Sequence, residues 1–171
     1  MAQAGVSTNG VTFSYGVGSN SKDGSKPTTM TLLDRINAIG GITIEDEVID
    51  ASALEDKLTR NIKGRGNTGG SFAVTVNVTD ETIEEWQAVI ERFNGLESSQ
   101  ALWFQTIIPG LTNAFWVIAE PPSAIPQPEF AQNELLTVEM NMTIADYVGS
   151  SSAVEPVENP VTSGDTSGGG A

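Results

Sequence analysis

The segment from Gly70 to Gly95 constrains the fold most, because a strand pattern there runs directly into a helix pattern. Between Phe72 and Val78 apolar and polar residues alternate, which is typical of a strand with one buried face. From Asp80 to Asn94 the apolar residues recur every three or four positions, which predicts an amphipathic helix. These residues are Ile83, Trp86, Val89, Ile90 and Phe93. We expect the rest of the chain to pack against this strand and helix.

The other segments with regular patterns have the length of strands and are apolar on one or both faces. The predicted strands cover 11–17, 28–33, 42–49, 100–108, 114–119 and 136–146. Between the predicted strands 28–33 and 42–49, the spacing of Leu33, Ile36 and Ile39 predicts a single helical turn. The expected fold is α+β and mainly β: a β-sandwich or barrel of about six to eight strands with one flanking helix.

The composition changes at the C-terminal end. From Gly149 onward the residues are mostly Gly, Ser, Pro, Thr and acidic residues, which bury too little apolar surface to offset the entropy of ordering. The sequence therefore predicts one domain over 1–148 and a flexible, disordered tail over 149–171.

The composition also argues against catalysis. The chain contains no cysteine and no histidine, so the commonest general base and the commonest ligands of transition metals are both missing. We expect no enzyme activity, no cofactor and no metal. Paired carboxylates for a hydrolase have candidates in Glu45, Glu47, Glu120 and Glu129, but these fall in expected connections and on outer strand faces. No apolar run is long enough for a membrane anchor.

The 171-residue chain carries a net charge of −14, and its few basic residues are unevenly placed. Such a chain does not bind nucleic acid by neutralising phosphates. Four of its eight basic residues lie in the irregular segment from Asp50 to Gly70, which we expect to form a long protruding loop. The candidate assembly residues of this loop are Asp50, Lys57, Arg60, Lys63 and Arg65.

Two predicted strands present continuous polar faces. The residues of these faces are Thr75, Asn77, Thr137, Glu139, Asn141 and Thr143. If several copies join, such faces are able to line a water-filled bore, as polar strand faces do in large barrels. In a monomer the same faces are simply exposed to solvent, so the pattern leaves both interpretations open.

The order of these features resembles that of a known family. The sequence Val48-Ile49-Asp50-Ala51-Ser52 ends an acidic strand, the loop with Arg60 and Lys63 follows, and Gly70-Ser71-Phe72 opens the next strand. The helix around Trp86–Phe93, two aromatic strands and a final alternating strand complete the series. From about Val11 to Val148 the chain resembles the major tail tube proteins of long-tailed (siphovirus-type) bacteriophages.

The resemblance implies a structural subunit that assembles into stacked hexameric rings, through which DNA passes without specific binding. It implies that the loop from Asp50 to Gly70 reaches the neighbouring ring and that the lumen is acidic. Its implied partners are further copies of the chain, the tape measure protein, the tail terminator and the distal tail protein. The location would be the phage virion, after synthesis in the host cytoplasm. Some relatives carry an additional immunoglobulin-like C-terminal domain, for which this chain is too short.

Three alternatives to a phage tail tube remain open from the sequence. The same fold serves the tube protein of contractile secretion systems. A monomeric carbohydrate- or ligand-binding β-sandwich would expose aromatic residues on one face, whereas Trp86, Trp103 and Trp116 occupy positions expected to be internal. A carboxylate-dependent hydrolase would need two acidic side chains that converge in a cleft.

Overall fold

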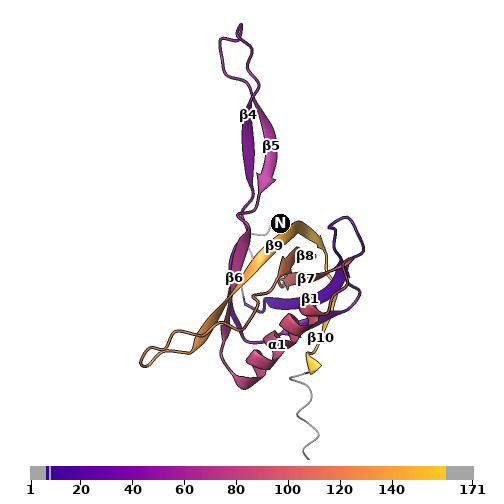
Figure 1. Ribbon diagram of the computed structural model, residues 1–171, viewed down its shortest axis with the longest axis vertical. Coiled ribbons are helices and arrows are strands. Elements are labelled where there is room, and N and C mark those ends of the chain that lie inside the picture. Colours follow the sequence, from indigo (N-terminus) through magenta and orange to yellow (C-terminus); the bar gives the residue numbers. More distant parts are fainter. Residues whose placement is uncertain (1–6, 8, 161–171) are drawn as a thin grey trace, which may run out of the picture.

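The computed structural model describes residues 7 and 9–160, and these form ten strands and one helix. In chain order the elements are β1 (Thr12–Ser19), β2 (Met30–Leu33), β3 (Ile36–Ile39), β4 (Glu45–Asp50), β5 (Asn61–Asn67), β6 (Ser71–Asn77), α1 (Asp80–Asn94), β7 (Gln100–Ile107), β8 (Asn113–Glu120), β9 (Thr137–Ser152) and β10 (Pro156–Val157). Figure 1 shows a rounded body from which the hairpin β4–β5 projects at the top. The predicted mainly β fold with one flanking helix is confirmed.

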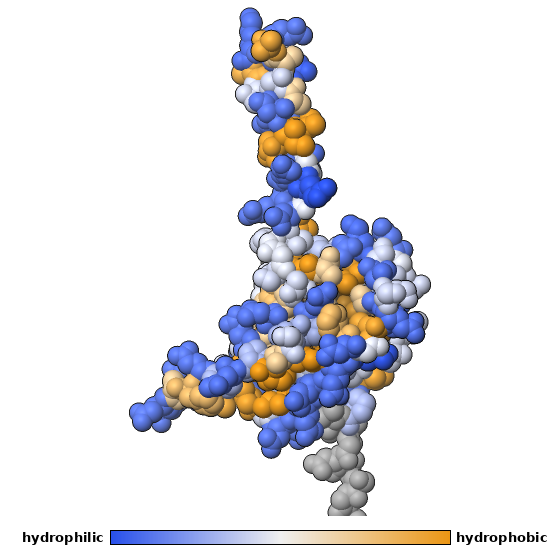
Figure 2. Space-filling model, in the orientation of Figure 1, coloured by the Kyte–Doolittle hydropathy of each residue, from blue (hydrophilic) through white to orange (hydrophobic). Residues whose placement is uncertain are grey.

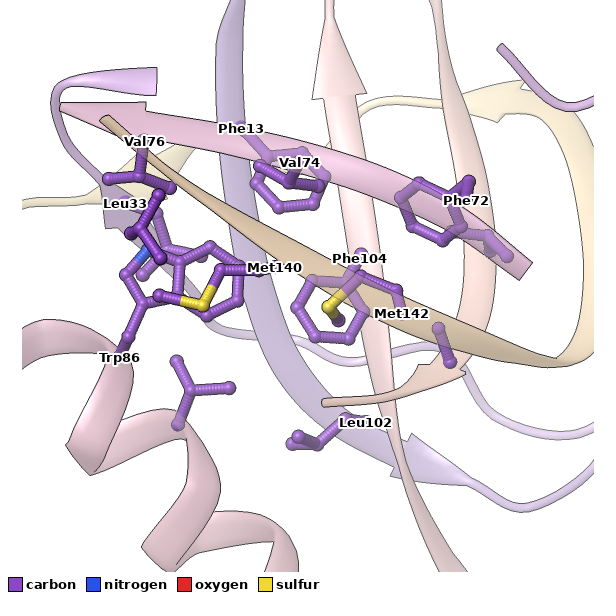
Figure 3. Packing of buried hydrophobic residues seen from close by; sticks show 14 residues of the cluster. Phe13, Leu33, Phe72, Val74, Val76, Trp86, Leu102, Phe104, Met140 and Met142 are labelled. Atoms are coloured by element: carbon purple, nitrogen blue, oxygen red, sulfur yellow. The ribbon is translucent and has the colours of Figure 1, made fainter. Parts of the chain in front are cut away.

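Eight of the strands form one sheet in the order β10-β2-β1-β7-β8-β9-β6-β3. Adjacent strands in this sheet run antiparallel, except for β10 and β2, which run parallel. The sheet is curled, because residues from distant strands meet in one core: Phe13 of β1 and Leu33 of β2 belong to the same cluster as Val76 of β6. Trp86 of α1 joins this cluster from the side of the helix (Figure 3).

The main core follows the alternation seen in the sequence. Phe72, Val74 and Val76 of β6 all point into it, and each is less than 10% exposed. The rings of Phe13 and Phe104 stack with their centroids 5.5 Å apart, which joins β1 to β7. All three tryptophans are fully buried, as their positions in the pattern predicted.

The helix begins at Asp80, as the sequence predicted, and Thr79 is its N-cap residue. The backbone N–H of Thr82 donates to the Thr79 hydroxyl at 3.2 Å, and the N–H of Thr79 donates to the Thr82 hydroxyl at 2.9 Å. This reciprocal pair is a capping box. Glu85 departs from the amphipathic pattern, since it is fully buried and its Oε2 accepts a 3.0 Å hydrogen bond from the N–H of Asp34. This bond ties α1 to the turn between β2 and β3.

The predicted helical turn at Leu33–Ile39 is wrong, because this stretch contains the edge strand β3. Arg35 has a left-handed backbone with φ 58°, which ends any helical path. Ile36 pairs with Val76 and Ile39 with Val74, and a bulge lies between them. The bulge inserts one extra residue, so two isoleucines three positions apart point to the same face. A strand thereby acquires the spacing of a helix.

The predicted boundary at 148 is also wrong, because regular structure continues to Val157. β9 runs to Ser152 and pairs with β8 along this extension, and β10 adds to the edge of the sheet beside β2. The segment from Gly149 to Asn159 covers a second apolar cluster, formed by Met30, Trp103, Ala114, Trp116 and Ile118 on the other face of the sheet. The rest of the predicted tail, 161–171, lies outside the described residues.

Polar side chains attach this C-terminal segment. Gln105 is buried, donates to the Val154 carbonyl at 2.8 Å and accepts from the Val154 N–H at 2.8 Å. The indole N–H of Trp116 donates to the Ser152 carbonyl at 3.2 Å, and Asn159 donates to the Leu32 carbonyl at 3.1 Å. Side-chain amides thus replace part of the apolar burial that this segment lacks.

Among the described residues, no helix has the length and apolar character needed to cross a membrane.

Candidate functional site

The hairpin β4–β5 is the first candidate surface, and it replaces the irregular loop expected between Asp50 and Gly70. The two strands pair antiparallel, with Ile49 opposite Ile62 and Val48 opposite Lys63. Together they project away from the body (Figure 1). The expectation of a protruding segment agrees with the structure, whereas the expectation of irregular backbone is wrong. The strand β5 has no apolar alternation that would reveal it, because its only large apolar residue is Ile62.

The glycines of β5 explain how so polar a strand pairs closely. A Cβ on Gly64 would lie 3.1 Å from atoms of Glu47 and Ile49. A Cβ on Gly66 would lie 3.0 Å from the Asp46 carboxylate. These contacts are tighter than ordinary van der Waals contact, so side chains from β4 occupy the space over the glycines. The glycine-rich sequence that suggested a loop therefore serves strand pairing.

All five predicted assembly residues lie on this hairpin. Asp50 ends β4, Lys57 and Arg60 lie in the connection at the tip, and Lys63 and Arg65 belong to β5. Lys63 Nζ lies 2.7 Å from Asp46 Oδ2 across the strand pair, and Arg60 Nε lies 3.6 Å from Asp56 Oδ1. Both basic side chains are more than 70% exposed, so these ion pairs orient the side chains more than they stabilise the fold.

Asp50 organises the start of the tip. Its Oδ1 accepts a hydrogen bond of 2.9 Å from the Ser52 N–H. Hydrogen bonds from the Ser52 side chain and backbone favour the carboxylate and hold the pKa of Asp50 below its ordinary value. The Ser52 hydroxyl in turn accepts from the Arg60 N–H at 2.7 Å, which closes the tip across both strands.

Large apolar side chains are exposed along the hairpin, although the sequence did not predict them as an interaction surface. They are Ile44, Val48, Ile49, Leu54, Leu58 and Ile62, each at least 44% exposed. Leu54 and Leu58, at the tip, are more than 80% exposed. Figure 2 shows apolar patches in the middle of the projection and at its end. An isolated two-stranded hairpin is marginally stable in water, and exposed apolar patches of this kind mark interaction sites.

The polar strand face is the second candidate surface. β6 and β9 are neighbours, with Thr75 opposite Glu139 and Asn77 opposite Thr137. Asn141 and Thr143 continue the same face along β9, while Val138, Met140 and Met142 point into the core. The structure therefore brings the six predicted residues together. Five of the six are neutral, so Glu139 supplies the only charge in this set.

An apolar groove lies beside the root of the hairpin. Its volume is about 650 Å³, and its lining includes Phe13, Ile36, Ile39, Ile42 and Phe72. Ile42 belongs to the segment that leads into β4, and Phe72 lies in β6 just after the hairpin returns. The groove leaves no signal in the sequence because its walls come from β1, β3, β6, β7, β8 and β9, which meet only in the folded chain.

The candidate carboxylates are spread over different elements of the described chain, and Glu120 is the last residue of β8. Glu45 and Glu47 lie on the hairpin, whereas Glu129 lies in the second projection, the connection between β8 and β9 (Figure 1). No cluster of three or more potential metal ligands of the His, Cys, Asp and Glu types occurs among residues 7 and 9–160. Burial raises the pKa of Tyr15, and the positive charge of Arg92 opposes this shift.

No protein-family model matches the sequence, and no curated protein matches it. Solved structures, in contrast, align with the chain over most of its length. A chain of the anti-feeding prophage cap, a tube-terminating cap, aligns with a TM-score of 0.56 and 16% identity over 90% of this chain and 95% of that chain. A chain from the sheath/tube terminator of an extracellular contractile injection system aligns with a TM-score of 0.53 and 15% identity, over 84% of this chain and 95% of that chain.

A chain from the anti-feeding prophage baseplate aligns with a TM-score of 0.50 and 15% identity, over 84% of this chain and 93% of that chain. The chain shares the fold of these three chains. At such identities the likeness establishes the fold. The resemblance noted in the sequence was to tubes of long-tailed phages, whereas these solved structures are a tube-terminating cap, a baseplate and the sheath/tube terminator of a contractile injection system.

Proposed function

We propose that this protein is a structural subunit of a phage-like tail, which self-assembles into stacked hexameric rings around a conduit for DNA. The exposed apolar hairpin carries the proposal. A projection that exposes six large apolar side chains gains stability when a neighbouring subunit covers them. We assign this hairpin, with Asp50, Lys57, Arg60, Lys63 and Arg65, to contact with the next ring.

The polar face of β6 and β9 supports the same proposal as the lining of the conduit. Thr75, Asn77, Thr137, Asn141 and Thr143 offer hydrogen-bonding groups without positive charge. With Glu139 and a net charge of −14, such a wall repels phosphates, so DNA slides along it without being retained. The subunit would perform no catalysis, and its partners would be other copies, the tape measure protein, the tail terminator and the distal tail protein.

A second candidate function is that of a terminator or cap, which ends a tube with a single ring. The solved structures with this fold favour it, because two of the aligned chains come from a tube-terminating cap and a sheath/tube terminator. The two roles differ in assembly. A tube subunit adds rings without limit, whereas a terminator forms one ring and stops.

Electron microscopy and sizing chromatography of the concentrated protein test both roles. Long hollow tubes support the tube subunit, isolated rings support the terminator, and a strict monomer over the whole concentration range argues against self-assembly.

The double variant Leu54→Ser with Leu58→Ser removes the apolar tip without touching the core, so it is expected to abolish ring stacking while the monomer stays folded. Leu111→Ser, at a leucine 39% exposed elsewhere on the surface, is the matched control and should assemble normally.

Charge reversal probes the same surface in another way. Arg60→Glu with Lys63→Glu places like charges against Asp56 and Asp46 and against any acidic neighbour. We expect impaired polymerisation with an unchanged circular dichroism spectrum of the body. Normal tubes from this double variant would contradict the assignment of the hairpin to ring contact.

A further inference from the structure

The groove at the root of the hairpin is open over the part of the chain that the structure describes. Its lining includes Phe115, which is 41% exposed although it is a large aromatic residue. Gly41 also lines the groove, and a Cβ built there would meet no atom within 4 Å. The groove therefore has both the apolar wall and the free space that an inserted side chain needs.

A second projection carries a side chain that suits this groove. The connection between β8 and β9 extends from the body at the lower left of Figure 1, in a different direction from the hairpin. It exposes Phe130 to 69% and Leu135 to 68%. Pro121, Pro122, Pro126 and Pro128 restrict its backbone, so the projection is partly pre-organised and loses little entropy on docking.

Charge complementarity favours a second copy of this chain as the occupant. Glu129 and Glu134 flank Phe130, and no basic residue follows Arg92 in the sequence. On the hairpin whose root borders the groove, Arg65 lies on β5, two residues from Asn67, which pairs with Glu45. No ion pair to Arg65 is present in the part of the chain that the structure describes. Acidic residues next to an aromatic side chain thus complement a basic residue on the hairpin whose root borders the apolar groove.

We propose that Phe130 of one subunit inserts into the groove at the hairpin root of a second subunit, where Glu129 and Glu134 face Arg65. The two surfaces differ, so the contact is heterologous and is repeated from copy to copy. This inference rests on the proposed function, because it requires the chain to self-assemble. It adds to that function a specific contact that does not involve the hairpin tip.

Disulfide trapping tests the contact directly, because the chain contains no cysteine. The variants Gly41→Cys, in the groove, and Ala131→Cys, next to Phe130, are purified separately, mixed at high concentration and oxidised. We expect a disulfide-linked heterodimer. Ser98→Cys lies in the exposed turn after α1 and serves as the control partner for Gly41→Cys. Adding Phe130→Ala to the Ala131→Cys chain should reduce the heterodimer roughly tenfold or more, as for the loss of an aromatic anchor.

The outcomes separate this contact from the proposed function. Wild-type rings or tubes without a Gly41→Cys to Ala131→Cys heterodimer would overturn the docking and leave the assembly role standing. Equal crosslinking with Ser98→Cys, or crosslinking that Phe130→Ala does not reduce, would also overturn it. Two further variants test the charge pairing. It is supported if Arg65→Glu in the Gly41→Cys chain reduces the yield of heterodimer and Glu129→Arg in the Ala131→Cys chain then restores it. Failure of both assembly and crosslinking would overturn both proposals.

Discussion

The attachment of the C-terminal segment depends on Gln105, and the variant Gln105→Leu isolates this dependence. The Gln105 side chain is fully buried. Its amide donates to the Val154 carbonyl and accepts from the Val154 N–H, both at 2.8 Å, and it also donates to the Ser14 hydroxyl at 3.2 Å. Leucine has a similar volume but no hydrogen-bonding group, so it removes all of these interactions and leaves the packing volume nearly unchanged.

The expected loss follows from the groups left without a partner. A polar group that loses its partner in a buried site costs about 1–3 kcal/mol. The N–H and carbonyl of Val154 are partly buried, and they regain some hydration if the segment detaches. The cost for each of these two groups therefore lies near the lower end of that range. The additional apolar surface of leucine offsets part of the loss. We expect the free energy of unfolding to fall by about 1–2 kcal/mol.

Urea unfolding of the monomer measures this change, and proteolysis locates it. Glu155 and Glu158 lie in the attached segment, so a glutamate-specific protease should cut there much faster in Gln105→Leu than in the wild type. Gln87→Leu, on the exposed face of α1, is the matched control and should change stability by no more than about 0.5 kcal/mol. A loss below about 1 kcal/mol with unchanged cleavage would refute the role assigned to Gln105.

Three further predictions concern the core, the helix cap and the hairpin tip. Trp86→Ala empties the centre of the main cluster and should cost about 3–5 kcal/mol in urea unfolding, and a loss below about 2 kcal/mol would contradict its central position. Thr79→Ala removes the acceptor for the Thr82 N–H and should lower the melting temperature by an amount equivalent to about 1 kcal/mol, whereas an unchanged transition would argue against the capping box. The pKa of Asp50 is lowered in the folded chain by hydrogen bonds from Ser52, so its contribution is fully present above the ordinary value of 3.8 and is lost as the pH falls through the folded pKa. An NMR titration should find the Asp50 midpoint below 3.8 and find it raised in Ser52→Ala, and a wild-type midpoint at or above 3.8 would contradict the geometry.

The elements that the sequence predicted well depend on local periodicity. The strand β6 and the helix α1 each bury one face against the core, so Phe72 to Val76 alternate and the stripe around Trp86 recurs at helical spacing. The central strands β7 and β8 were recognised because both of their faces are buried, one in each apolar cluster. In these segments the burial that stabilises the element also sets the pattern of its residues.

The elements that the sequence missed are held by distant partners. β5 has no buried face and forms because it pairs with β4. β3 contains a bulge, so its isoleucines have the three-residue spacing that is typical of a helical turn. The segment after Gly149 has a composition typical of a flexible tail, yet the side chains of Gln105 and Trp116 hold its backbone. Such contacts leave no trace in the segment's own periodicity, because the residues that stabilise it lie elsewhere in the chain.

The candidate surfaces divide in the same way. The charge of the hairpin and the polar faces of two strands were visible in the sequence, since charge and alternation are properties of neighbouring residues. Only the tertiary structure decided that β6 and β9 lie side by side, that apolar residues line the projecting hairpin, and that a groove opens at its root. Periodicity reports which face of an element is buried, whereas the choice of neighbour depends on strand order and sheet curvature, which arise from the whole chain at once.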